Sequence, residues 1–559
     1  MFSAGDELEI LKSILPFSFL FFLPLFIVIS PVSMVGASHE FQIHRMHQYD
    51  LQGISHGCRS THINLEARSL SNWSTQRHCV ITRFEDITLK MLSDIKQYAG
   101  GLLIILPRDV TVLSQQEKQL LGDIETQLLK GEVNLPIYFS TWSPEFEVIL
   151  RDVENSKLTD EKAPTAWDAI LNSVSANGYQ VVVSANKATP KVDSHIISIQ
   201  GKLAGYGLED KLPTIAIVAY YDSFGVSPEL SFGTDNNGSG VIMLLELVRI
   251  FSYLYASSRA HARVNILFLL SGGGKLNYQG SKKWLEDQLD GLEGSLIQDA
   301  MYVLCLDAVG ASNNLNVHVS KPPKERSPAA QFLQDLKSAH ENVTVEVVHK
   351  KINLAEDFLA WEHERYSIRR LPAFTLSTLK SYKDPARDTI FDTVDSVDAK
   401  KLAANIEALA LALARQIYNI TALSNPLNSH ISVDPEFVKT WMDFLTSQPR
   451  APMLLSEKNN PLIKVLQDSM HRYLKDTKTI FHTADKRDPE FVFYDVTKAT
   501  VYIYNVKPAV FDLFLMVIIT LYLSVIYLIV QASIVFTCIH LYIYIYIYIY
   551  IYTLIKYVI

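Results

Sequence analysis

The stretch that decides the fold runs from Thr214 to Ser281. It reads TIAIVAYYDSFG (214–225), SFGTDNNGSG (231–240), VIMLLELVRIFSYLY (241–255) and VNILFLLSGGGKLNYQGS (264–281). Two apolar runs rich in β-branched residues predict buried parallel strands, and the segment between them has the apolar spacing of a helix. A strand–loop–helix–strand unit indicates a parallel sheet. Ligands bind such sheets at the carboxyl ends of the strands, so we expect any chemistry in the loops after Tyr221 and Leu270.

The same alternation continues outward in both directions. The patterns predict strands at 99–107, 134–140, 301–306, 343–348 and 373–376, and helices at 115–130, 328–340 and 399–418. This is the pattern of an α/β protein with a doubly wound, mostly parallel sheet. We divide the chain into a signal peptide (1–37), an N-terminal α/β region (38–194), a main domain (195–420), an accessory membrane-proximal region (421–508), a transmembrane helix (509–536) and a tail (537–559).

Composition excludes some functions. The 559 residues carry a net charge of −8, and no basic run suggests nucleic-acid binding. The four cysteines are too few for a disulfide scaffold, and their spacing does not fit a cysteine-based zinc site. Cys58 and Cys79 either pair in an oxidising compartment or stay free thiols, and the sequence leaves both possibilities open.

Both ends of the chain contain apolar segments. Residues 14–30 have the length of a signal-peptide core, and the small residues before Ala37 predict cleavage there, with an uncleaved anchor as the alternative. Residues 514–536 are almost purely apolar and long enough to span a membrane as a helix. A translocated N-terminus would put the large domain in the lumen or outside the cell. Residues 542–552 alternate tyrosine and isoleucine, a β-prone run that we interpret as a read-through or gene-model artefact.

Four Asn-x-Ser/Thr sequons lie in the part expected to be translocated, at Asn72, Asn237, Asn342 and Asn419. Behind a signal peptide, several are expected to be glycosylated, and the alternative is that some are buried. Asn237 lies in the loop that opens the central helix, so we expect a glycan there to stand over the mouth of the site.

The central stretch resembles the co-catalytic zinc aminopeptidase superfamily, which includes nicastrin and the transferrin receptor ectodomain. Its sequence frame is matched in order by Asp222, residues 233–240 (GTDNNGSG), 244–247 (LLEL), 280–281 (GS) and 306–310 (LDAVG). The resemblance implies the zinc aminopeptidase type of fold.

The same resemblance implies that the metal chemistry is lost. The first His position holds Tyr220, the bridging Asp position Asn236, the Glu-Glu pair Gly274 and Lys275, the last His position Asp388 and the one retained ligand position Asp307, while Asp222 would have oriented the missing His. A dizinc site needs imidazole and carboxylate ligands and a general base. A neutral amide, a glycine and a lysine supply none of these, so we expect no bound metal or cofactor and no peptidase activity.

A narrower resemblance covers about residues 39–535. The segments 212–226 (LPTIAIVAYYDSFGV), 270–286 (LSGGGKLNYQGSKKWLE), 352–377 (INLAEDFLAWEHERYSIRRLPAFTLS) and 484–495 (ADKRDPEFVFYD) are similar to the nicalin family, a noncatalytic branch of the superfamily. This implies a single-pass glycoprotein of the endoplasmic reticulum membrane with a lumenal domain. The implied partners are a NOMO-like lumenal protein, a small multi-spanning membrane protein and the ribosome-bound translocon. The implied roles are assistance in multi-pass membrane protein biogenesis and restraint of Nodal signalling.

Two other functions stay open at this point. One is a residual zinc-dependent aminopeptidase, which zinc content would reveal. The other is a ligand-binding ectodomain of the receptor type at the cell surface, which the type of glycan would distinguish from a protein retained in the endoplasmic reticulum.

Overall fold

The computed structural model describes residues 39–109, 112–160, 178–207, 212–256, 261–291, 295–298, 300–420, 432–506 and 509–558. The predicted signal peptide lies outside the described residues. Backbone contacts divide the chain into two units. The large unit comprises Glu40–Leu150 and Val181–Val501, and the second unit contains Met1–His39, Arg151–Gln180 and Tyr502–Ile559.

An eight-stranded sheet forms the centre of the large unit, in the order β15-β14-β16-β13-β11-β12-β10-β17. Its middle strands β12, β11, β13 and β16 are parallel, whereas β10 is antiparallel to β12 and β17, and β14 is antiparallel to β16. The strands are β10 His195–Leu203, β11 Thr214–Tyr220, β12 Asn265–Ser271, β13 Ala300–Leu306, β14 Asn314–Val319, β15 Thr344–His349, β16 Ala373–Ser377 and β17 Asp476–Thr483.

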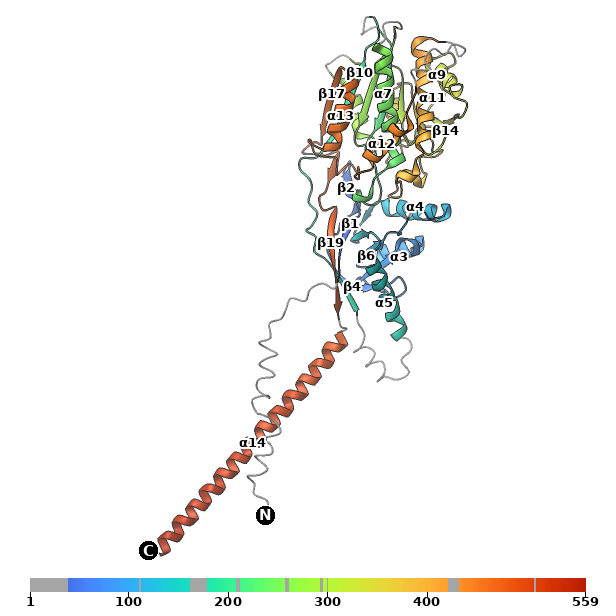
Figure 1. Ribbon diagram of the computed structural model, residues 1–559. Helices are drawn as coiled ribbons and strands as arrows, with labels where there is room; N and C mark the ends of the chain where they lie inside the picture. The colour runs from blue at the N-terminus through green and yellow to red at the C-terminus, as the bar shows by residue number, and fades with distance from the viewer. Residues whose placement is uncertain are drawn as a thin grey trace. The chain divides into compact units, whose positions relative to one another are not determined.

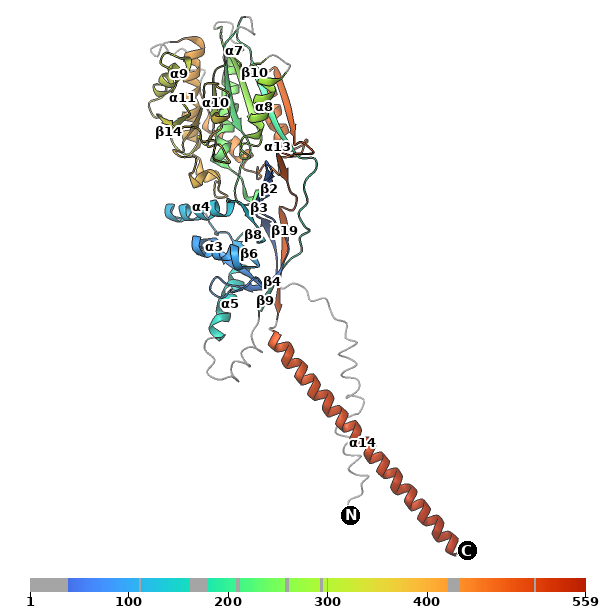
Figure 2. The same cartoon turned by 180° about the vertical axis from the view of Figure 1, so that it is seen from behind.

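Helices cover both faces of this sheet, as a doubly wound fold requires (Figures 1 and 2). Ile215 and Ile217 of β11 point into a core with one set of helices, while Ala216 and Val218 point into a second core with the other set. This is the alternation of a strand that is buried on both faces. The first set is α7 Gly240–Ala256, α9 Pro328–Lys337, α11 Ala399–Tyr418, α12 Pro435–Leu445 and α13 Pro461–Tyr473, and the second is α8 Gln279–Asp290 and α10 His363–Ile368.

The N-terminal part of the large unit has its own parallel strands. β4, β5, β6 and β8 pair in that order, and β1 is antiparallel to β8. A small sheet joins β18, β2, β3 and β7. The bounds are β1 His39–Arg45, β2 Gln48–Leu51, β3 Ile54–Cys58, β4 Ile63–Arg68, β5 His78–Arg83, β6 Gly101–Ile105, β7 Glu132–Val133, β8 Ile137–Ser140, β9 Gly178–Val183, β18 Phe491–Phe493, β19 Lys498–Val506, α3 Leu89–Tyr98, α4 Gln115–Leu129 and α5 Pro144–Asp160.

Local sequence signals account for the limits of key helices. Helix α4 begins at a capping box, in which the side chains of Ser114 and Glu117 each bind the other's backbone N–H. Helix α11 begins after Asp398, whose carboxylate accepts from the N–H of Lys400, and it ends at Asn419 in the left-handed conformation. The strands and helices that the sequence predicts between residues 99 and 418 are all present, within a few residues of their expected limits.

The expected accessory region over 421–508 does not form a layer of its own. Strand β17 is an edge strand of the main sheet, and it pairs with β10 along its whole length. Helices α12 and α13 bury Met442 and Leu466 in the main core. A polar composition concealed this role, because an edge strand and two amphipathic helices each bury only one face. The other predicted domain boundaries stay predictions.

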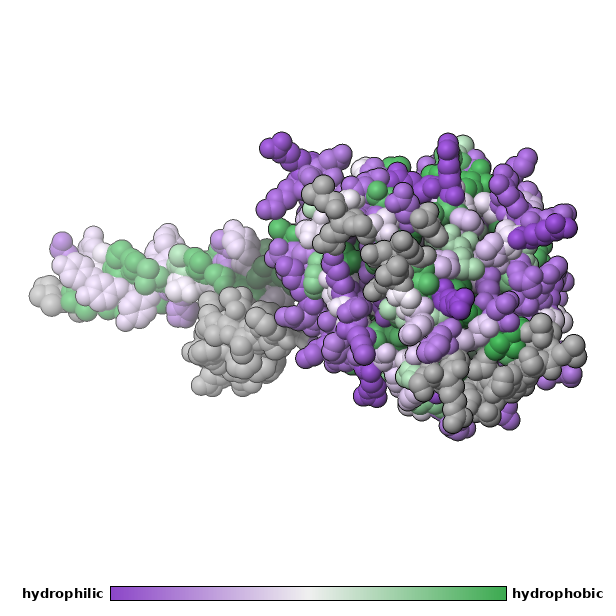
Figure 3. All heavy atoms as spheres, turned by 90° about the horizontal axis from the view of Figure 1, so that it is seen from above, coloured by the Kyte–Doolittle hydropathy of each residue, from purple (hydrophilic) through white to green (hydrophobic). Residues whose placement is uncertain are grey.

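Helix α14 (Ala509–Val558) is continuous over 50 residues and includes the whole tyrosine–isoleucine repeat. The repeat, although β-prone in composition, is therefore helical, and its interpretation as an artefact stays a prediction. Extending an existing helix adds one hydrogen bond for each residue fixed, whereas a strand needs a partner strand to satisfy its backbone. Its stretch Leu515–Tyr557 is long and apolar enough to span a membrane, and none of the most apolar window is buried. In Figure 3 most of its side chains are coloured green (hydrophobic) or near white, with a few purple (hydrophilic) groups. The stretch Thr234–Ala256, which includes α7, meets the same criterion but belongs to the core, because most of it is buried.

The cysteines of the described chain are all free. Cys58 and Cys79 are both buried and do not pair with each other, which decides the open alternative in favour of free thiols. Burial raises the pKa of the Cys79 thiol to about 12, so it stays protonated and unreactive at neutral pH.

Candidate functional site

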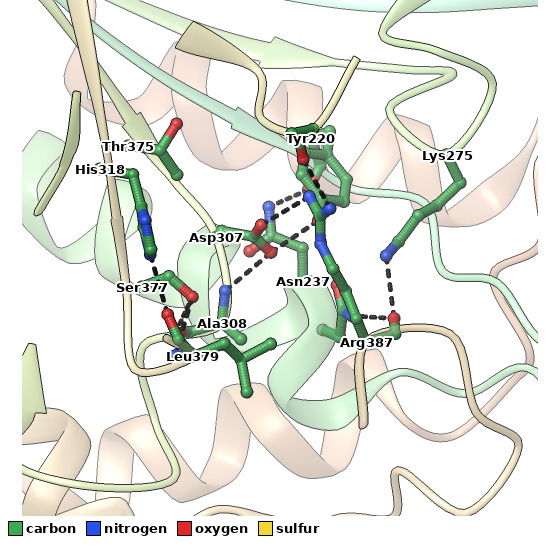
Figure 4. Close-up of polar contacts among 12 residues, drawn as sticks. Tyr220, Asn237, Lys275, Asp307, Ala308, His318, Thr375, Ser377, Leu379 and Arg387 are labelled. Atoms are coloured by element: carbon green, nitrogen blue, oxygen red, sulfur yellow. Dashed lines mark hydrogen bonds and ion pairs between the residues drawn. The ribbon is translucent and has the colours of Figure 1, made fainter. Parts of the chain in front are cut away.

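The candidate site lies where the sequence places it, at the carboxyl ends of three neighbouring parallel strands. Tyr220 ends β11, Asp307 follows β13, and the loop after β12 carries Lys275. A further segment, which contains the short helix η5 (Pro385–Arg387), brings Arg387 to the same place (Figure 4). All the positions that the resemblance assigns to the superfamily's metal site come together here.

Asp307, the one ligand position that the sequence retains, is fully engaged by protein groups. Its Oδ1 lies 2.7 Å from the hydroxyl of Tyr220 and 2.9 Å from the backbone N of Ala308. Its Oδ2 accepts a hydrogen bond from Nη2 of Arg387 at 2.9 Å. Burial favours a higher pKa for this carboxyl, but the charges of Arg387 and Lys275 outweigh burial and hold the pKa below its usual value. Asp307 is therefore an ionised partner of two cations.

Arg387 is held rigidly in the site. Its guanidinium also donates to the carbonyl of Ala360 and to the hydroxyl of Tyr278, both at 2.7 Å. The guanidinium lies 4.5 Å from the ring centroid of Trp361, and the ring of His318 stacks on the same indole at 4.0 Å. These contacts fix a positive charge against the carboxylate of Asp307, the expected metal-ligand position. No pattern in the sequence marked Arg387, apart from its position next to Asp388.

A second cation fills the position of another lost ligand. Nζ of Lys275 lies 2.8 Å from Oδ1 of Asp388 and 2.9 Å from the carbonyl oxygen of Arg387. The Lys275 side chain is only 7% exposed. Nζ also lies 5.6 Å from the ring centroid of Tyr220, within the range of a cation–π contact. Two positions that would carry metal ligands in an enzyme therefore form an ion pair with each other.

Asn236, at the bridging position, is used as a hydrogen-bonding group. Its Oδ1 lies 3.0 Å from the hydroxyl of Tyr220, and its Nδ2 donates to the carbonyl of Arg387. The backbone N–H groups of Asp235 and Asn236 donate to the carboxylate of Asp392. The sequence did not mark Asp392 as a site residue either. In the structure its carboxylate fixes the loop that opens α7.

The general-base position is closed sterically. A Cβ atom at Gly274 would lie 2.2 Å from a ring carbon of Tyr220, so a glutamate cannot occupy this position while Tyr220 is present. Asp222 does not orient an imidazole. It accepts instead from the backbone N–H groups of Gly274 at 2.9 Å and Lys275 at 3.1 Å. The residues at the positions expected for the first histidine and for the base, Tyr220 and Gly274, therefore lie against each other.

A pair of zinc ions does not fit these residues. Both oxygens of Asp307 are already engaged, and a guanidinium and an ammonium group lie beside them. Within the described chain, no group of three or more His, Cys, Asp or Glu residues is placed to hold a metal ion. A dication beside these two fixed positive charges would be repelled, so we derive no catalytic step through zinc.

Open space lies beside this cluster. A cavity of about 460 Å³ lies between α4 and the segment 379–396, and its lining includes Asp235 and Asp392. Tyr220, Lys275, Asp307 and Arg387 do not line it. The cluster itself is closed by its own side chains.

The four sequons differ in how accessible their asparagine side chains are. Asn237 is fully buried, and its Nδ2 donates to the carbonyls of Tyr220 at 2.8 Å and Leu306 at 3.0 Å. This packing leaves no room for a glycan on that nitrogen, and the expected glycan over the site stays a prediction that the packing disfavours. Nδ2 of Asn72 is also buried. The side chains of Asn342 and Asn419 are exposed.

Comparison with known proteins supports the same fold and a narrower family. Residues 202–413 match the model of peptidase family M28. The BOS complex subunit ncln of Danio rerio is 45% identical over 549 residues, which cover 94% of this chain and 96% of that protein. The BOS complex subunit NCLN of Homo sapiens is 45% identical with the same coverage, and Nicalin of Caenorhabditis elegans is 30% identical over 88% of this chain and 90% of its own. The crystal structure of the γ-secretase component nicastrin matches with a TM-score of 0.58 and 12% identity, over 84% of this chain and 100% of that chain.

These findings define the class of protein first. The M28 family match and the likeness to the nicastrin structure give the chain a nicastrin-like M28 peptidase fold. The near full-length relatives then decide the branch: the chain belongs to the nicalin family, whose vertebrate members are named as subunits of the BOS complex. The resemblance noted from the sequence is confirmed.

Proposed function

We propose that this chain is a noncatalytic, membrane-anchored subunit of a BOS-type complex. In this role it acts at the endoplasmic reticulum membrane, with its large unit in the lumen, and assists the biogenesis of multi-pass membrane proteins. Its proposed partners are a NOMO-like lumenal protein, a small multi-spanning membrane protein and the ribosome-bound translocon. Restraint of Nodal signalling is a further proposed role.

One observation carries the noncatalytic part of the proposal. Arg387 and Tyr220 take up the carboxylate of Asp307, which is the one ligand position retained from the superfamily. An enzyme of this superfamily would need that carboxylate free to bind zinc and a base nearby to activate water. The base position holds Gly274, which Tyr220 keeps small. The fold is then available as a scaffold for partners.

Zinc content and activity test the noncatalytic part. We expect the full-length chain, purified in mild detergent, to contain far less than one zinc per chain and to show no aminopeptidase activity above that of an Asp307→Asn variant. About two zinc ions per chain, or an activity that the Asp307→Asn change abolishes, would favour the residual aminopeptidase and overturn this part.

A pull-down tests the assembly part. The tagged full-length chain, solubilised from cells in mild detergent, is expected to bring down the three proposed partners, while an unrelated single-span membrane protein with the same tag does not. A chain that reaches the membrane but recovers none of them refutes the proposed role. Glycans sensitive to endoglycosidase H are expected, because they indicate retention in the endoplasmic reticulum, and resistant glycans would instead support a receptor at the cell surface.

A further inference from the structure

Strand β15 is an edge strand of the main sheet, and in the described part of the chain no strand pairs with its outer side. It pairs with β14 in parallel register. The N–H of Thr344 donates to the carbonyl of Asn313, and the N–H of Lys350 donates to the carbonyl of Val319. These two bonds lie six residues apart on the same side of the strand. Hydrogen-bonding direction alternates along a strand, so the N–H and C=O groups of Val345, Val347 and His349 face away from the sheet.

Such an edge is a template for another strand. Proteins commonly protect edges with lysine, proline, a bulge or a very short strand. The sequence of β15, TVEVVH, contains no lysine or proline, and its register with β14 is continuous over six residues. Val347 is 40% exposed. Apart from His349, Glu346 is the only residue of β15 with an ionisable side chain. The strand itself therefore has little protection.

A sequon stands at the start of this strand. Asn342 and Thr344 are exposed, while Val343 between them is 4% exposed and packs into the core. The N–H of Val343 donates to the carbonyl of His340, which closes a turn just before the strand. Asn342 is therefore accessible on a fixed turn, two residues before the first residue of β15, in contrast to the buried side-chain nitrogens of Asn72 and Asn237.

We propose that Asn342 carries an N-linked glycan and that this glycan covers the open edge of β15 against pairing with a second copy of this chain. The six residues of the strand span about 20 Å, and the glycan would be attached just before its first residue. The inference rests on the lumenal placement in the proposed function. In the transfer, Nδ2 of Asn342 forms a bond to the anomeric carbon of N-acetylglucosamine. The bond from that carbon to the pyrophosphate of a lipid-linked oligosaccharide breaks, and the proton from Nδ2 leaves with the pyrophosphate.

Peptide mapping tests the modification. The full-length chain from secretory-competent cells is treated with peptide N-glycosidase in heavy-oxygen water, which converts each glycosylated asparagine to labelled aspartate. We expect label at Asn342 and at the exposed Asn419, but not at Asn237. Label at Asn419 without label at Asn342 overturns this inference and leaves the lumenal placement intact, whereas no label at any sequon overturns both.

Self-association tests the protective role. Asn342→Gln and Thr344→Ala remove the same sequon in different ways, and Asn419→Gln removes the other exposed sequon as a control. Light scattering in detergent measures the protein mass of each particle. We expect this mass in Asn342→Gln and in Thr344→Ala to be at least twice the wild-type value, while Asn419→Gln leaves it unchanged. Adding Val347→Lys to Asn342→Gln is expected to restore the original mass, because a lysine protects an edge strand. Unchanged mass in both sequon variants overturns the protective role.

Discussion

The buried ion pair between Arg387 and Asp307 is expected to stabilise the filled site, and replacing Arg387 by methionine tests this. The two side chains are 9% and 2% exposed, and Nη2 lies 2.9 Å from Oδ2. Unit charges about 4 Å apart attract by about 4 kcal/mol at an effective dielectric constant of about 20. Removing one partner of a buried pair leaves an uncompensated charge and typically costs about 3–5 kcal/mol. We therefore expect Arg387→Met to lose about 4 kcal/mol of unfolding free energy.

Thermal unfolding of the full-length chain in detergent, followed by tryptophan fluorescence, measures this loss. For a unit of this size, 1 kcal/mol corresponds to about 1 °C in Tm, so we expect Tm to fall by about 4 °C. Asp307→Asn is expected to cost a similar amount, and the double variant much less than the sum. A matched control is Lys283→Met, which removes an exposed ion pair with Asp287 and should shift Tm by less than about 1 °C.

The pH dependence gives a second measure of the same pair. The folded-state pKa of Asp307 lies below its usual value, so its stabilising effect is complete above that usual value and is lost as pH falls through the folded pKa. Without the guanidinium, burial is expected to raise the pKa of Asp307, and the deficit of Arg387→Met should shrink as pH falls from 7 to 5. Single-variant losses that simply add in the double variant would refute the reasoning.

Three further predictions concern other buried groups. Gly274→Ala should lose about 1–3 kcal/mol by overpacking, and clearly less in a Tyr220→Ala background, as Tm of the four chains will show. Burial raises the pKa of Glu125 to about 8, above its unfolded value, so the folded state binds the proton more tightly. The free energy of unfolding should therefore fall as pH rises from 5 to 8, by up to about 1.4 kcal/mol per pH unit, and Tm should fall with it. Glu125→Gln should flatten this slope, and an unchanged slope would contradict the assignment. Asn237→Asp should be more destabilising than Asn237→Ala, because it turns a carboxylate toward two carbonyl oxygens, and equal Tm values would count against the hydrogen bonds described.

Local pattern was enough to predict the framework of the site. The strands that end at Tyr220 and Leu306 are continuous apolar runs, and such runs have few structural alternatives in an α/β chain. Since the loops after parallel strands gather at one edge, the spacing of Tyr220, Asn236, Lys275 and Asp307 was sufficient to bring them together.

What the sequence could not predict depends on contacts between distant segments. Arg387 meets Asp307 across 80 residues and rests on Trp361, and no local pattern marks such a contact. Burial of Asn237 was missed for the same reason, because its partners are carbonyl groups of two strands. The helical state of residues 542–552 was missed because alternation favours a strand when the preceding helix is left out of account.

The length of α14 has a consequence for how a bilayer can hold it. At 1.5 Å per residue, its 50 residues span about 75 Å, against a hydrocarbon core of about 30 Å. To fit the whole helix, the axis would have to tilt by about 66°, whereas transmembrane helices tilt by about 0–40°. Even at 40° about 26 residues cross the core, and nearly half of the helix must lie in the head-group layer or beyond it. Tyrosine is favoured at that depth, because its apolar ring can lie among the lipids while its hydroxyl meets water. The repeat therefore has a composition typical of a segment at the membrane–water interface.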